Sequence, residues 1–346
     1  MTSIALDVMG SDGGPEPLVE GAARLSREDV DVQVLLVGDE ARIAEALKKQ
    51  KYDPSRLAVV HARGQVPMNM KPAEALDTIE DCSVLRAARL VQDGDAQAIV
   101  SAGNTGGLIL ASARTFQRLP GISRCALAAV YPTELRHGPR DDPFALMLDV
   151  GATLNCTAED LRGFAVMGSA YSRIISDIGR PRVALLSNGS EASKGTPNIV
   201  EAHAALAAFS AGDGSNALDF AGNVEGLDIP RGTVDVVVCE GFVGNVVLKM
   251  LEGVSEVVSD LARDAYARRF LWRLGLTMLS QGIRQIRTKT DWKQYGGAPV
   301  LGFDQVVIKA HGRSNARAIR NALKVAAKAV DRDLSGEIKR TMASFE

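Results

Sequence analysis

The 346-residue sequence has little of what marks metal sites, membrane spans and nucleic-acid binding. Its four cysteines, Cys82, Cys125, Cys156 and Cys239, lack CxxC spacing, which favours small buried side chains in a reduced protein over a zinc site. No uninterrupted apolar run approaches the roughly 20 residues of a membrane-spanning helix. The formal net charge of -2 gives no reason to expect nucleic acid. We therefore expect no bound metal, no nucleic-acid partner and no membrane span.

A secretory signal is also missing, because Ile4-Ala5-Leu6 already has the pattern of a strand and no basic segment with an apolar core precedes it. The sequence therefore predicts a cytoplasmic protein. A composition of 46% hydrophobic and 24% charged residues is that of an ordinary globular protein. The length predicts a single unit over residues 1–346, with two lobes around a central cleft as one arrangement of it.

Apolar runs at 4–6, 32–37, 57–61, 98–100, 144–148, 183–186, 234–238 and 306–309 predict strands. Segments with helical spacing lie between them, and one of these segments is 73–92. This alternation predicts an α/β fold with a mostly parallel sheet. Six of the strand ends are followed by glycine together with Asn, Ser, Asp or Lys. Ligands of parallel sheets bind beyond the carboxyl ends of the strands, so we expect these loops to converge on one cleft.

The stretch 98–113, AIVSAGNTGGLILASA, carries the clearest signal for a binding site. It reads as a buried strand, a tight polar loop and a helix, whose first backbone N–H groups would face an anion. Ser101, Asn104 and Thr105 supply short polar side chains, and the glycines allow close approach. Because neither GxGxxG nor GxxxxGK[ST] occurs in this stretch, nothing specifies a dinucleotide or a nucleoside triphosphate. An ordinary strand-to-helix turn is the alternative interpretation.

Other strand-end loops hold charged candidates. Asp7 and Asp12 could bind a metal, but two acids in a glycine-rich turn more often accept hydrogen bonds from local backbone. Lys194 could neutralise a phosphate or be a solvated surface lysine. His311, one of four histidines, is either a catalytic residue or simply a hydrogen-bonding one.

Residues 245–289 depart from the α/β pattern and predict a projecting helical hairpin. It begins at Asn245, with Lys249 one turn further along the same face. Between 265 and 290 there are six cations and no acid. Apolar side chains lie among these cations, and they include Phe270, Leu271, Trp272, Leu274 and Leu276. This mixture suits an anionic membrane surface, whereas a dimer interface is the competing interpretation. Both remain open, because a hairpin can pair along its stem and still present its tip.

Eight strings spread over the whole chain together resemble the PlsX family of phosphate acyltransferases. The strings, in chain order, are DVMGSDGGP from Asp7, SAGNTGG from Ser101, LDVGA from Leu148, LLSNGSEASKG from Leu185, GNVEG from Gly222, EGFVGNVVLK from Glu240, YGGAPVLG from Tyr295 and KAHGRSN from Lys309. Their common order makes the resemblance far more specific than any single motif.

The resemblance implies a three-layer α/β/α fold like that of phosphotransacetylases and the isocitrate and isopropylmalate dehydrogenases. It also implies reversible transfer of a fatty acyl group from acyl carrier protein to inorganic phosphate, forming acyl phosphate for phospholipid synthesis. No cofactor is expected. Further implications are a homodimer, peripheral contact with an anionic membrane, and delivery of the product to a membrane acyl-phosphate:glycerol-3-phosphate acyltransferase.

With these substrates, phosphate can attack a thioester directly, so the protein has mainly to hold the two reactants and stabilise the oxyanion. We expect phosphate on the loop from Ser101 to Gly106 with Lys194, and carbonyl polarisation by Asn104, Asn245 or His311. The substrate-binding candidates are Asp7, Gly10, Ser101, Gly103, Thr105, Gly106, Asn188, Asn223, Glu225, Glu240, Gly244, Lys249, Gly312 and Ser314.

Two functions of other classes compete with acyl transfer. One is an NAD(P)-dependent dehydrogenase on the same scaffold, which is disfavoured because the sequence shows neither a nicotinamide fingerprint nor a cluster of metal-binding aspartates. The other is a non-catalytic membrane scaffold for lipid-synthesis enzymes.

Overall fold

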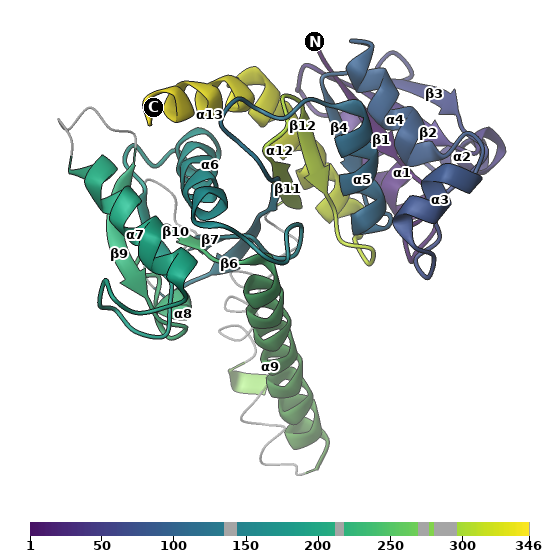
Figure 1. The fold of residues 1–346 in the computed structure, drawn as a ribbon. Coiled ribbons are helices and arrows are strands. Elements are labelled where there is room, and N and C mark those ends of the chain that lie inside the picture. Colours follow the sequence, from purple (N-terminus) through teal and green to yellow (C-terminus); the bar gives the residue numbers. More distant parts are fainter. Residues whose placement is uncertain (135–143, 212–217, 269–276, 280–295, 346) are drawn as a thin grey trace.

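The computed structural model describes residues 1–134, 144–211, 218–268, 277–279 and 296–345 (Figure 1). A seven-stranded sheet has the order β3-β2-β1-β4-β12-β11-β5. Its strands are β1 (Thr2–Asp7), β2 (Val32–Gly38), β3 (Leu57–His61), β4 (Ala98–Ser101), β5 (Ala126–Leu127), β11 (Ala298–Leu301) and β12 (Val306–Lys309). The pairings from β3 to β12 are parallel, whereas β11 runs antiparallel to both of its neighbours.

A five-stranded sheet has the order β6-β7-β10-β8-β9. It consists of β6 (Ala129–Pro132), β7 (Phe144–Leu148), β8 (Arg182–Leu186), β9 (Asp219–Val224) and β10 (Val236–Val238). Only β6, at one edge, pairs antiparallel. The prediction of a mostly parallel sheet is thus confirmed, and it is realised as two sheets.

Helices cover both faces of each sheet, which gives the predicted three-layer α/β/α arrangement (Figure 1). The helices are α1 (Glu16–Ser26), α2 (Glu40–Leu47), α3 (Pro72–Thr78), α4 (Ser83–Gln92), α5 (Thr105–Thr115), α6 (Ala158–Ser176), α7 (Pro197–Ser210), α8 (Asp228–Arg231), α9 (Gly241–Arg268), α12 (Ala316–Asp331) and α13 (Leu334–Ala343). The central strands are buried on both sides, as in β4 and β12, where all four residues are buried and the first three are apolar. Parallel strands covered on both faces have this continuous rather than alternating pattern.

The two sheets are joined by the chain that runs through β5 into β6. In this run β5 pairs with β11 of the first sheet and β6 with β7 of the second. The Val150 N–H donates to the carbonyl oxygen of Leu127 at 2.9 Å, which fixes the junction. One hydrophobic cluster contains side chains from both sheets, such as Ile4 of β1 and Val236 of β10.

The helical spacing over 73–92 corresponds to two helices, α3 and α4, with a break between them. Asp81 in this break has φ of 50°, a left-handed conformation that a continuous helix does not contain. The break pairs with a distant residue, since the Gly64 N–H donates to the Asp81 carbonyl at 3.1 Å and the Ser83 N–H to the Gly64 carbonyl at 2.8 Å.

The long helix α9 projects from the body of the molecule (Figure 1). It contains the first part of the hairpin expected over 245–289. The proposed membrane residues Phe270, Leu271, Trp272, Leu274 and Leu276 lie outside the described residues. No helix among the described residues combines the length and the apolar composition needed to cross a bilayer.

Candidate active site

Three polar loops meet at the carboxyl ends of the neighbouring strands β1, β4 and β12. The Ser101 hydroxyl donates to the Asp7 carboxylate at 2.7 Å, which joins the first two loops. The Asp12 N–H donates to the Gly312 carbonyl oxygen at 3.1 Å, which joins the first and the third. The loops also approach each other closely at Gly103, where a Cβ atom would lie 3.3 Å from the Met9 carbonyl oxygen. The expected convergence therefore occurs for these loops.

Asp7, Ser101 and Lys309 form a row across the three strands, because Ser101 is the register partner of both other residues. Asp7 exposes only 2% of its surface, and its carboxylate accepts hydrogen bonds from Ser101, from Ser83 and from the Met9 N–H. Burial raises the pKa of this carboxyl, although these hydrogen bonds act in the opposite direction. Asp7 is thus a buried hydrogen-bond acceptor whose position these hydrogen bonds hold.

Lys309 is the site residue that the sequence did not reveal. It exposes 7% of its surface, and its ammonium donates to the carbonyl oxygen of Ala310. Burial lowers the pKa of Lys309 to about 8, against the attraction of Asp7 and Asp12. The available signal was a lysine directly after Val306-Val307-Ile308 in a strand expected to be buried.

His311 follows two residues later, at the start of the β12–α12 loop. Its Nδ1 atom accepts the Arg313 N–H at 3.1 Å, so the proton of the neutral ring is on Nε2. Burial and, second, the charge of Lys309 lower the pKa of His311. Both effects favour the neutral imidazole, in which Nε2–H is the hydrogen-bond donor. Ser314 and Gly312, two other candidates in this loop, are buried.

The loop before α5 has the structure of a capped helix start. Asn104 is the N-cap, and its Oδ1 accepts the Gly107 N–H at 3.0 Å. Its amide nitrogen lies 3.4 Å from the Pro67 carbonyl oxygen. The first helical residues, Thr105 and Gly106, have N–H groups without a partner within the helix. Asn104 therefore shapes the loop, and the helix start presents backbone donors.

The candidates on the second sheet form a separate group. Asn223 is buried, donates to the Glu191 carbonyl oxygen at 2.8 Å and contacts His203 at 2.9 Å, so it holds the β8–α7 loop. Asn188, Lys194 and Glu225 are exposed. The backbone contact of Lys194, from its N–H to Glu191 at 3.0 Å, is within its own loop. The structure does not bring Lys194 into contact with the Ser101–Gly106 loop.

The start of α9 is fastened to the loop after β7. Asp149 is fully buried and accepts four backbone N–H groups, from residues 127, 151, 152 and 153, at 2.6–3.0 Å. A Cβ atom on Gly244 would lie 1.9 Å from the Asp149 carbonyl oxygen, so only glycine fits there. Glu240 is partly buried just before the helix, and Asn245 lies beside Gly151.

Further along, α9 passes the loop that carries His311. Arg313 of this loop lies 4.0 Å from Glu256 of α9. Lys249 and Glu252 pair at 2.8 Å, and their charges act on the pKa of His311 in opposite directions. Of the second-sheet candidates, Lys249 is therefore the one that these interactions place near the His311 loop.

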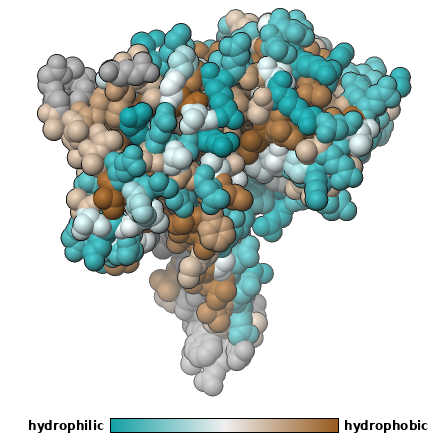
Figure 2. Space-filling model, in the orientation of Figure 1, coloured by the Kyte–Doolittle hydropathy of each residue, from teal (hydrophilic) through white to brown (hydrophobic). Residues whose placement is uncertain are grey.

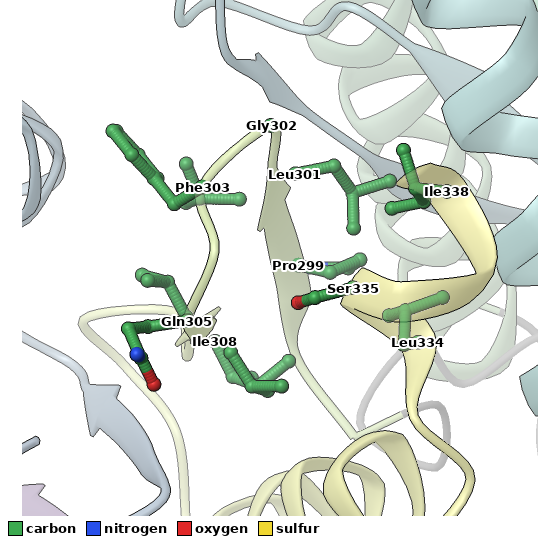
Figure 3. A pocket seen from close by; sticks show the side chains of 12 residues that line it. Pro299, Leu301, Gly302, Phe303, Gln305, Ile308, Leu334, Ser335 and Ile338 are labelled. Atoms are coloured by element: carbon green, nitrogen blue, oxygen red, sulfur yellow. The ribbon is translucent and has the colours of Figure 1, made fainter. Parts of the chain in front are cut away.

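Two small cavities differ in chemistry. One, of about 10 Å³, lies beside Asp7, Ser83, Ser101 and Asn104. The other, also of about 10 Å³, is lined mainly by apolar residues of β11, β12 and α13, and Figure 3 shows Leu334 and Ile338 of α13 beside it. Each has room for about one water molecule, so a larger substrate would lie at the mouth of the polar one.

The cysteines are buried, as expected. Burial raises the pKa of Cys125 to about 11 and of Cys156 to about 12, which makes these thiols poor nucleophiles. Within the described part of the chain, no group of three or more His, Cys, Asp or Glu side chains is arranged to hold a metal ion.

The fold is shared with solved structures of two kinds of enzyme. A phosphotransacetylase from Streptococcus pyogenes matches with a TM-score of 0.62 and 17% identity, over 95% of this chain and 94% of that one. A 4-hydroxythreonine-4-phosphate dehydrogenase from Klebsiella pneumoniae matches with a TM-score of 0.50 and 16% identity, over 95% and 100%. The protein thus has the α/β/α scaffold of the phosphotransacetylases and of this dehydrogenase.

Sequence comparison narrows this class to one family. Residues 2–336 match the family described as "Fatty acid synthesis protein". A "Phosphate acyltransferase" of Myxococcus xanthus is 43% identical over 97% of this chain and 92% of its own length. One of Thermoanaerobacter pseudethanolicus is 37% identical over 99% and 98%. The chain therefore belongs to the PlsX family of phosphate acyltransferases.

Proposed function

We propose that this protein transfers a fatty acyl group reversibly from acyl carrier protein to inorganic phosphate, and that the acyl phosphate is used to make phosphatidic acid. The observation that carries the proposal is the meeting of three strand-end loops, which bring together the buried Lys309, the start of α5 and His311. Family membership supports the same reaction. No cofactor is needed, because phosphate itself supplies the nucleophile.

In the forward reaction a phosphate oxygen forms a bond to the thioester carbon, and the carbon–sulfur bond breaks. The electron pair of that bond goes to sulfur, and the thiolate takes up the proton that hydrogen phosphate loses. The protein has to hold the anion near the carbonyl and to stabilise the oxyanion as it develops. Backbone N–H groups at the start of α5 suit the anion.

We assign carbonyl polarisation to His311, because its neutral ring carries the proton on Nε2 and can donate it in a hydrogen bond. The other two candidates differ in position. Asn104 uses its side-chain oxygen to cap α5. Asn245 lies on the exposed side of the start of α9 and stays a candidate for contact with the acyl donor, as do Lys194 and Lys249.

The test measures phosphate-dependent release of free carrier thiol from acyl carrier protein thioester, with acyl phosphate trapped by hydroxylamine. His311→Gln should lower kcat by about 10²–10³-fold, the usual loss for one donor to an oxyanion. His61→Gln is the matched control, because His61 Nδ1 also accepts a backbone N–H, from Glu40 at 3.3 Å, but at the edge strand β3. Thiol release without phosphate, or equal loss in both variants, would contradict the assignment.

The protein should act as a homodimer through α9. Exposed apolar residues recur along this helix at intervals of three or four, at Val243, Val246, Met250, Val254, Val257 and Leu261. In Figure 2 hydrophobic residues follow the projecting helix. Such a stripe is the sequence pattern of paired helices.

The segment beyond α9 should bind the cytoplasmic face of the membrane peripherally and bring the product to a membrane acyl-phosphate:glycerol-3-phosphate acyltransferase. The support is the sequence of 265–290, with six cations and no acid. Leu271→Asp combined with Leu274→Asp should abolish flotation with anionic vesicles and leave acyl transfer intact. Normal flotation by a monomeric double variant would make the tip an oligomer contact instead.

A further inference from the structure

Lys309 is a buried cation without a carboxylate partner at bonding distance. Among the described residues, no Asp or Glu oxygen forms an ion pair with its ammonium, and the one hydrogen bond of that group goes to the Ala310 carbonyl oxygen. A lysine ammonium has three donors, so two remain for another acceptor. Buried charges in proteins are normally paired or bound to a ligand.

Asp7, the nearest acid on the same row, is already engaged. Its carboxylate accepts from Ser101, Ser83 and the Met9 N–H. It attracts Lys309 across the width of β4, but it does not form a salt bridge with it. The fold therefore places a positive charge beside a hydrogen-bonded acid without pairing the two.

The Lys309 ammonium donates to the carbonyl oxygen of Ala310. The Ala310 N–H in turn donates to the carbonyl oxygen of Ser101 at 2.8 Å, so the ammonium lies where β12 meets β4. Ser101 is also the residue that leads into the loop before α5, where the Gly103 N–H donates to the Ser101 hydroxyl at 3.1 Å. The lysine and the first N–H groups of α5 thus flank the same loop. A compact ammonium and a helix start are two complementary donors for a phosphate dianion.

We infer that Lys309 is the residue that holds the substrate phosphate, between the carboxyl end of β12 and the start of α5. Asp7 balances the charge of the lysine when the site is empty. The inference deepens the proposed function and rests on it for the identity of the anion. It assigns to Lys309 the role expected from the sequence for Lys194, whose loop belongs to the other sheet.

The experiment titrates the whole protein with inorganic phosphate alone and follows binding by calorimetry. Lys309→Met keeps an unbranched side chain that is one heavy atom shorter and removes the charge, so phosphate should bind at least tenfold more weakly, as expected for the loss of a charge-assisted hydrogen bond. Lys328→Met is the control, because Lys328 also donates to a carbonyl oxygen, of Ile175 at 2.9 Å, but it lies on α12, is 25% exposed and pairs with Asp177. Its phosphate affinity should equal that of the unchanged protein.

Kinetics give the second readout, which a purely structural role would not produce. Lys309→Met should raise KM for phosphate and leave KM for the acyl donor unchanged, and Lys194→Ala should have the smaller effect on phosphate. If Lys309→Met does not fold, Lys309→Gln takes its place in both measurements. Unchanged phosphate affinity in the Lys309 variant, or no phosphate binding by the unchanged protein, overturns the inference. Binding that depends on Lys309 without any acyl phosphate formation supports the inference and refutes the proposed function.

Discussion

Replacing Lys309 by methionine should make the protein more stable at neutral pH. Burial lowers the pKa of Lys309 from 10.5 to about 8, which means that folding disfavours the charged form. At about 1.4 kcal/mol for each pKa unit, the charge costs roughly 3 kcal/mol of the free energy of unfolding at pH 7. Methionine has no charge to bury, but Asp7 loses the attraction of the lysine. We therefore expect a net gain of about 1–3 kcal/mol.

The pH dependence of the stability difference shows whether the buried charge of Lys309 causes it. Below pH 8 the lysine is charged in both the folded and the unfolded chain, so its cost is fully present. Between about 8 and 10.5 the folded protein has released the proton while the unfolded chain still holds it, so the stability of the unchanged protein rises relative to the variant. The advantage of Lys309→Met should therefore be large at pH 7 and small near pH 10.

Urea unfolding at one protein concentration measures the stability gain at pH 7 and its decrease towards pH 10. Comparing the variant with the unchanged protein at each pH cancels the contribution of the other titrating groups. Lys328→Met is the control. Lys328 is partly exposed and pairs with Asp177, so its replacement should give no gain in stability at pH 7. If Lys309→Met were less stable than the unchanged protein at pH 7, the lysine would be a structural ion-pair residue and the reasoning would fail.

Three further predictions concern the frame of the site. Gly244→Ala should prevent stable folding, as measured by circular dichroism, because the new Cβ would lie 1.9 Å from the Asp149 carbonyl oxygen. Gly253→Ala is the control on the same helix: its Cβ would lie in open space, so the free energy of unfolding should rise by about 0.5–1 kcal/mol. Asp149→Asn should lower the free energy of unfolding in urea by about 1–3 kcal/mol, because an amide NH2 group replaces one carboxylate oxygen and cannot accept the backbone N–H groups. An unchanged midpoint would contradict this. Val257→Asp with Leu261→Asp should convert the dimer to a monomer in analytical ultracentrifugation, and a dimer in both proteins would exclude this face.

The strands and the three converging loops could be predicted from sequence because both are local signals. Runs such as Val306-Val307-Ile308 fit a buried strand, and Gly, Ser and Asn after a strand fit a polar loop. The order of the strands in the sheet is not a local property. The row from Asp7 through Ser101 to Lys309 exists because β1, β4 and β12 are neighbours, and two of these pairings join segments about 90 and 200 residues apart in sequence.

Contacts between segments that are distant in sequence also explain the features that the sequence did not predict. The break between α3 and α4 depends on the pairing of Asp81 and Ser83 with Gly64, which no helical spacing reveals. Asn223 was a substrate-binding candidate, but its side chain interacts with Glu191 and His203. Polar residues after strands can bind a substrate or hold the loop itself, and only the contacts distinguish the two uses.

Helix α9 connects the loops of the candidate active site with the surface proposed for dimerisation. Its first turn is locked against the Asp149 loop through Gly244, and its middle lies beside His311 through Lys249, Glu252 and the Arg313–Glu256 contact. The apolar stripe begins on these same turns. A shift of the helix on forming the dimer would move charges next to His311, because close-packed elements transmit displacement rather than absorb it. The pKa of His311 is therefore expected to respond to the oligomeric state, and Val257→Asp with Leu261→Asp should change the lower limb of the pH–rate profile even though both residues lie beyond the site. An unchanged pH–rate profile in the monomeric variant would show that dimerisation through α9 does not affect His311.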